Sequence, residues 1–339
     1  MKKIVFLIGV VFLCLFSCKS IKKHENDLIN FTYKINLVEQ DILNEDFKKA
    51  LINYKKIYKI YKRLLTAKNC FTATQLSIIQ NDKEQAKNFI VEGMNKGLIP
   101  KYYYNDSIIN RFIIENNLND FINEQYLQSK KKYEKNIDKN LNYNINSISN
   151  EDNKWKIYYL DSLSRIDKEN KDLYYKKYDS IVKEIVEKKL LPIMLMENFS
   201  ERKLELNCLG CINNENSLNY AFGNNNIKIV LLHYFSFKRE KDKIESIKKV
   251  VFKGNFCPRK FAEISDYFAK FSNDPDYFYN EWANIQDLEQ ISKINERRLN
   301  IGLTSFQDKD RKFERGKMVC KEKRKGSNKQ FIKLFYWCG

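Results

Sequence analysis

The stretch that decides the fold is NCFTATQLSIIQ (69–80), followed by the dipeptide ND (81–82) and KEQAKNFIVEGMNKG (83–97). The dipeptide forms a tight polar turn between two pieces with helical patterns. Ala73 and Ala86 are small residues that let two such helices approach closely, and Gly97 is placed to cap the second helix. The sequence therefore predicts a helix, a turn and a second helix here.

This arrangement resembles a tetratricopeptide repeat, in which Phe89 would take the large apolar position of the second helix. The glycine expected near Gln80 is missing, and there is only one full repeat, whereas a free-standing solenoid needs about three. A plain αα-hairpin is the alternative. In either case, we expect the pair to pack on the preceding helix and on the segments after Gly97.

Residues 35–65, just upstream, also have a helical pattern, with lysines on the face opposite an apolar stripe. A helix start inside this stretch is plausible at Asn44, which precedes two acidic residues. The stripe consists of Ile42, Phe47, Leu51, Tyr54, Ile57, Tyr58, Tyr61, Leu64 and Leu65.

The chain begins with MKKIVFLIGVVFLCLFSC (1–18), in which two lysines precede an apolar run over residues 4–16. This is the layout of a secretory leader, and the run is shorter than the roughly 20 residues of a membrane-spanning helix. The order Leu-x-Ser-Cys resembles a bacterial lipobox, which implies acylation of Cys18 and a membrane as a partner. Lys19 stands where an aspartate would favour inner-membrane retention, so the outer membrane is favoured.

The formal net charge of +18 does not by itself indicate nucleic-acid binding. Only 11 of the 61 basic residues are arginine, the residue that forks onto phosphates and guanine edges. Lysine is spread along nearly the whole chain. We therefore predict no nucleic-acid partner, while attraction to anionic surfaces, either lipid headgroups or an acidic glycan, stays open.

Farther downstream, residues 140–153 are rich in Asn and Ser and lack a sustained period, which predicts a linker. A helical pattern returns from Trp155 to Leu191. The apolar run 227–237 could be a buried helix or a strand.

Near the end, two short runs around a Gly-Ser-Asn turn could form a β-hairpin, closed by a disulfide between Cys320 and Cys338. The expected fold class is mainly α, with helical hairpins followed by an irregular helical domain.

Cys208 and Cys211 form the one CxxC pair, in an Asn-rich loop. A zinc site is disfavoured because no second CxxC accompanies it and the two histidines, His24 and His233, are distant in sequence. A structural or unpaired role is favoured over redox chemistry. We predict no metal and no cofactor.

These observations divide the chain into six parts. They are a leader (1–17), a tether (18–34), a tetratricopeptide-like helical domain (35–139), a linker (140–153), a helical domain (154–307) and a basic tail (308–339).

The order of features over residues 40–305 resembles an uncharacterised family of bacterial secreted proteins and lipoproteins. That family has a tetratricopeptide-like front and a helical C-terminal domain of unknown function. Lys168 and Tyr267 replace the Gln and Arg of its pattern, and a Tyr-Gly-Thr-Gln motif is absent near Tyr279, so this chain resembles a degenerate member. The matching positions are Asp167, His233, Asp266, Arg297, Arg298 and Gly302-Leu303.

The resemblance implies a candidate catalytic set of His233, Asp167, Asp266 and Arg298. Histidine is the commonest general base, an aspartate beside it would fix its tautomer, and the arginine would hold an anion. The alternative is that His233 is a hydrogen-bonded core residue. We expect a membrane-anchored protein-binding or scaffold module with a protein partner in the cell envelope, with a degenerate hydrolase as the rival interpretation.

Overall fold

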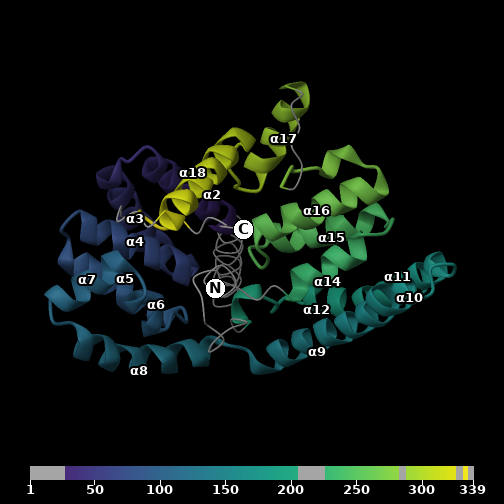
Figure 1. Ribbon diagram of the computed structural model, residues 1–339, viewed down its shortest axis with the longest axis horizontal. Coiled ribbons are helices and arrows are strands. Elements are labelled where there is room, and N and C mark those ends of the chain that lie inside the picture. Colours follow the sequence, from purple (N-terminus) through teal and green to yellow (C-terminus); the bar gives the residue numbers. More distant parts are fainter. Residues whose placement is uncertain (1–26, 205–225, 282–287, 326–330, 335–339) are drawn as a thin grey trace, which may run out of the picture.

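The computed structural model describes residues 27–204, 226–281, 288–325 and 331–334. Within these ranges the regular structure is entirely helical, which confirms the mainly α fold class. Figure 1 shows two groups of helices, one early and one late in the chain, joined along one edge of the molecule by α8 (Asn119–Asn136) and α9 (Lys139–Lys156).

The first group, α2 to α7, packs around two adjoining cores that contain residues such as Phe31, Tyr54, Phe89 and Ile109. The predicted apolar stripe of residues 42–65 is split between two helices, because Asn44–Asp46 interrupt it. The elements are α2 (Asp27–Leu43), α3 (Phe47–Tyr61), η1 (Lys62–Leu64), α4 (Ala67–Ile79), α5 (Lys83–Asn95), α6 (Pro100–Tyr104) and α7 (Ser107–Glu115).

The predicted helix–turn–helix is formed by α4 and α5. Thr66 and Asn69 make a capping box at the start of α4, and Asp82 caps α5 by accepting from the Gln85 backbone N–H. Gly97 follows α5 with φ of 93°, the left-handed conformation expected of a residue just after a helix.

The predicted tether is shorter than expected, because residues 27–34 belong to α2. Leu28, Phe31, Ile35, Val38 and Ile42 are all buried and follow one another at steps of three and four. The burial of this apolar face on the first core offsets the entropy lost when the helix forms.

The predicted linker at residues 140–153 is also helical, because it lies inside α9. Asp138 caps the helix, and its buried side carries Ile145, Ile148 and Asp152. The abundant Asn and Ser lie mainly outside this narrow buried stripe. The composition therefore predicted a linker, although the few buried residues are spaced as in a helix and tertiary packing stabilises that helix.

The second group packs around one core that runs from Ile145 to Leu303. The run 227–237, left open between helix and strand, forms α14 as far as Phe235. The elements are the π-helical segments η2 (Ile157–Leu163) and η3 (Val186–Leu190), α10 (Ser164–Ile166), α11 (Lys171–Ile185), α12 (Leu191–Leu195), η4 (Glu201–Lys203), α14 (Asn226–Phe235), α15 (Lys241–Phe252), α16 (Pro258–Ser272), η5 (Pro275–Tyr277) and α17 (Leu288–Asn300).

The start of the predicted C-terminal hairpin is instead the helix α18 (Phe306–Arg324). Ser305 begins it, since its hydroxyl accepts from the Asp308 backbone N–H at 3.1 Å. This helix returns to the first group: Lys312 pairs with Glu39 of α2, and Arg315 pairs with Glu45. Figure 1 shows α18 beside α2.

We predict that Gly93→Ala destabilises the fold by about 2 kcal/mol, because the new methyl group would collide with the Tyr103 hydroxyl. That hydroxyl is buried and donates to the Ile90 carbonyl oxygen at 2.8 Å. The cost should exceed the gain in helix propensity of about 1 kcal/mol for replacing glycine by alanine. Chemical denaturation would measure it.

Tyr103→Phe is the matched control, because it removes the oxygen that the methyl group would meet. The double variant should be more stable than the sum of the two single changes predicts. Strict additivity of the two changes would contradict the proposed collision.

Candidate functional site

His233 lies on α14 and forms a buried polar cluster with α9 and α11. Its Nδ1 lies 2.6 Å from Oδ2 of Asp152, whose side chain is almost fully buried. The Tyr178 hydroxyl donates to the other carboxylate oxygen at 2.7 Å. One carboxylate thus binds groups from two other helices.

This geometry determines which ring nitrogen of His233 is available to accept a proton. When the Asp152 carboxylate accepts, Nδ1 carries the hydrogen, and in the neutral ring Nε2 keeps its lone pair. The histidine side chain is 22% exposed, so it is partly accessible to solvent. Burial raises the pKa of Tyr178, with the Asp152 charge adding to the effect, so its phenol stays protonated at neutral pH.

Asp167, one of the predicted partners of His233, instead forms hydrogen bonds with residues close to it in sequence. It accepts from the Asn170 side chain at 2.9 Å and from the Tyr174 hydroxyl at 2.8 Å. These hydrogen bonds lower the pKa of the Asp167 carboxyl. The residue organises the start of α11, and Asp152 replaces it as the partner of His233.

Asp266, the second predicted acid, is buried on α16 and holds the backbone after η5. It accepts from the backbone N–H groups of Tyr279 at 2.6 Å, Asn280 at 3.1 Å and Glu281 at 2.5 Å. Burial raises the pKa of Asp266 to about 6, against the lowering effect of these donors. Ionisation of Asp266 therefore costs more in the fold than in the unfolded chain, although the carboxylate still predominates at neutral pH, where it fixes this turn.

Arg298, the predicted anion holder, is buried and engaged inside the protein. It donates to the Tyr279 and Thr304 carbonyl oxygens at 2.8 and 2.7 Å and to Glu281 at 2.6 Å. Burial alone would raise the pKa of Glu281, but nearby cations that include Arg298 lower it. The structure thus brings Asp266 and Arg298 to the same turn, without His233.

Asp152 was not among the predicted site residues, because it falls inside the predicted linker. The spacing of Leu141, Ile145, Ile148, Asp152 and Trp155 nevertheless places an acid within an apolar helical stripe. A buried carboxylate needs hydrogen-bond partners, so that spacing would have indicated a polar partner on a neighbouring helix.

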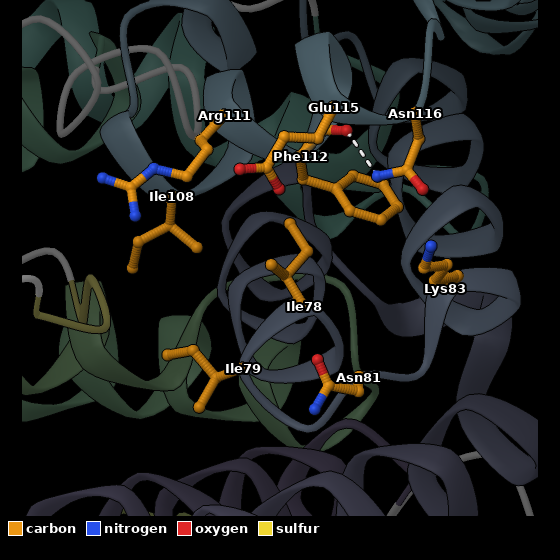
Figure 2. A pocket seen from close by; sticks show the side chains of 9 residues that line it. All are labelled: Ile78, Ile79, Asn81, Lys83, Ile108, Arg111, Phe112, Glu115 and Asn116. Carbon is orange, nitrogen blue, oxygen red and sulfur yellow. Dashed lines mark hydrogen bonds between the residues drawn. The ribbon is translucent and has the colours of Figure 1, made fainter.

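A second candidate site is a cavity of about 300 Å³ between the end of α4, the start of α5 and one face of α7. Figure 2 shows Ile78 at its centre, with Phe112 and Ile108 of α7 beside it. Ile108, Arg111, Phe112 and Glu115 have the i, i+3, i+4, i+7 spacing that places them on one side of the helix.

The rim of the cavity is polar. Lys83, Arg111 and Glu115 are exposed, and none of them makes an ion pair with the other described residues of the rim. Asn116 donates to the Phe112 carbonyl oxygen at 2.8 Å, as the dashed line in Figure 2 shows. An apolar floor with a charged rim is the ordinary composition of a binding pocket.

Three cysteines, Cys70, Cys257 and Cys320, lie among the residues that the structure describes. Cys320 takes part in a disulfide, while its predicted partner Cys338 lies outside the described residues. Cys18 and the pair Cys208 and Cys211 lie outside them as well. Cys70 and Cys257 are free thiols.

Two negative findings concern metals and membranes. Within the ranges that the structure covers, no three His, Cys, Asp or Glu side chains are grouped so that they could hold a metal ion. In the same ranges, no helix combines the length and the apolar character needed to cross a membrane.

Comparisons with protein-family models, with curated proteins and with solved structures found no match.

Proposed function

We propose that this chain is a membrane-anchored envelope lipoprotein that binds another protein, with the outer membrane favoured over the inner. The anchor rests on the leader at residues 1–17 and on Cys18 in its lipobox-like context. The resemblance to bacterial lipoproteins over residues 40–305 agrees with this proposal. The cavity beside α7 is the observation that supports the binding role.

The cavity suits one large apolar side chain of a partner. Ile78, Ile79, Ile108 and Phe112 line its floor, and its volume of about 300 Å³ is at the lower limit for binding pockets. Protein interfaces concentrate binding energy where such an anchor enters a desolvated pocket surrounded by polar groups. Arg111 is well placed at the rim to pair with an acidic group next to that anchor.

We predict that a photo-crosslinking amino acid at Lys83 captures a partner in the envelope. Lys83 is exposed at the rim, in the first turn of α5, so the substitution leaves the floor intact. The same amino acid at Lys177, exposed on α11, is the control. Gel electrophoresis after irradiation should show a discrete adduct for position 83 and not for position 177.

An Ile78→Arg change in the same chain should abolish that adduct, because it places a charge on the cavity floor. Circular dichroism would check that this variant is folded. An adduct that survives in the folded variant, or one that forms equally from position 177, would argue against the cavity as the binding site.

For the anchor, we predict that cells fed a fatty-acid analogue label the native chain and do not label Cys18→Ala. A thioether-linked lipid on Cys18 is the attachment that the lipobox implies, so removing that sulfur removes the label. Cys257→Ala is the control, because it also removes a free thiol but should keep full labelling. Labelling that persists in Cys18→Ala would contradict acylation at this residue.

A hydrolase is the second candidate function, and the His233–Asp152 pair favours it. In such a reaction Nε2 of His233 would take a proton from water as the oxygen attacks an ester carbonyl carbon. The imidazolium would then return the proton to the leaving alcohol. Asp152 would orient the ring and stabilise its charged form.

For this second candidate, we predict that hydrolysis of a p-nitrophenyl ester falls at least about a hundredfold in His233→Gln, the usual size of a general-base contribution. Tyr178→Phe, which keeps the His233–Asp152 hydrogen bond, should change the rate much less. Release of p-nitrophenol measures both. A rate in the native chain that equals the rate in His233→Gln would exclude this function for the ester.

A further inference from the structure

We infer that the outer side of α8 and α9 docks on an anionic phospholipid surface. The inference concerns a row of residues spaced by four, which we call the lysine stripe: Leu127, Lys131, Lys135, Lys139 and Tyr143. The first three lie on α8 and the last two on α9. All five are exposed.

The stripe faces away from the protein core on both helices. The buried residues of α8 are Ile122, Ser129 and Tyr133, and 3.6 residues per turn place Lys131 and Lys135 opposite them. On α9 the same geometry places Tyr143 opposite Ile145 and Ile148. Figure 1 shows α8 and α9 together forming one edge of the molecule.

The lysines of the stripe lack counter-charges inside the protein. Across the ranges that the structure describes, Lys131, Lys135 and Lys139 make no ion pair, while the neighbouring Lys130 pairs with Glu134 at 3.9 Å. Lys131 and Lys135 lie one helical turn apart on α8, which is closer than the Debye length of about 8 Å, so they repel each other. An external anionic surface relieves this repulsion.

The two ends of the stripe favour lipid over other polyanions. Leu127 is 65% exposed and Tyr143 is 73% exposed, among the most exposed large apolar residues of the described chain. The headgroup region accepts an aliphatic side chain and the amphipathic ring of tyrosine next to lysines. Nucleic acid would favour arginine, and the stripe contains none.

This docking goes beyond the proposed function and would also orient the anchored protein. The acidic residues on α8 are Asp120, Glu124 and Glu134, and Asp138 caps α9. Lys130 pairs with Glu134, and Asp120 and Glu124 both precede Leu127. Between Leu127 and Tyr143, five lysines stand against two carboxylates, so this part of the edge keeps a positive excess.

The test compares vesicles of phosphatidylcholine alone with vesicles that also contain phosphatidylglycerol. The protein is the full chain with Cys18→Ala, so no acyl chain contributes. The apolar run 4–16 is present in every variant and contributes equally to both vesicle types. Co-sedimentation should show a preference for the anionic vesicles that weakens in high salt.

The decisive variant is Lys131→Glu/Lys135→Glu/Lys139→Glu, which should lower partition onto anionic vesicles at least about tenfold. The matched control, Lys176→Glu/Lys177→Glu/Lys183→Glu on α11, makes the same change of net charge at exposed positions. It should stay within about twofold of the parent. Thermal unfolding would check that both variants fold.

Three results would overturn the inference: no preference for anionic vesicles, an equal loss in both triple variants, or full displacement by an RNA homopolymer bound through the same lysines. Because every protein in this comparison lacks the Cys18 sulfur, the outcome does not depend on acylation. A failed fatty-acid labelling and a failed docking are therefore separate results.

Discussion

The arrangement of the two helical groups depends on the return of the late part of the chain to its first helix. The Asn36 side chain of α2 donates to the Gly302 carbonyl oxygen at 2.8 Å, and Gly302 has φ of 80° directly against the backbone of Ile29. No other residue type fits there, since a β-carbon would meet the Ile29 carbonyl oxygen. This close approach holds the segment just before α18 against α2.

Electrostatics and apolar burial then reinforce that closure. Glu39 of α2 is buried and lies between Lys312 of α18 and Lys68 of α4, and although burial alone would raise its pKa, these cations lower it. Ile332 and Leu334 complete the first apolar core from the far end of the chain. Removing one partner of such a buried pair costs several kcal/mol, because it leaves the other charge buried without a partner. The ion pairs of Glu39 therefore favour this placement of α18 on α2.

The sequence predicted the helical class and the α4–α5 pair well, because capping residues and small residues at contact points are local features. It failed where a helix has only a narrow buried stripe. Residues 140–153 are the clearest case, since Asn and Ser dominate the composition while Ile145 and Ile148 decide the structure. At the end of the chain, the run before the Gly-Ser-Asn turn was expected to form one strand of a hairpin, but it lies in a helix that Ser305 caps.

The candidate catalytic set was only partly predictable for a related reason. His233 was identified through the family resemblance, but its partner Asp152 lies 81 residues away on α9, in the segment whose composition predicted a linker. Asp266 and Arg298 do meet at one turn, because both bind the backbone of residues 279–281. Which acid lies next to which base is determined by tertiary packing and not by local pattern.

The closure between Gly302 and α2 has a consequence for biogenesis. A ribosome adds roughly 5–20 residues per second, so the first helix emerges many seconds before the segment that covers it. During that interval, Asn36 of α2 lacks the Gly302 carbonyl oxygen that it binds 266 positions later in the polypeptide. The closure of the late segment onto α2 therefore forms only after most of the polypeptide has been synthesised.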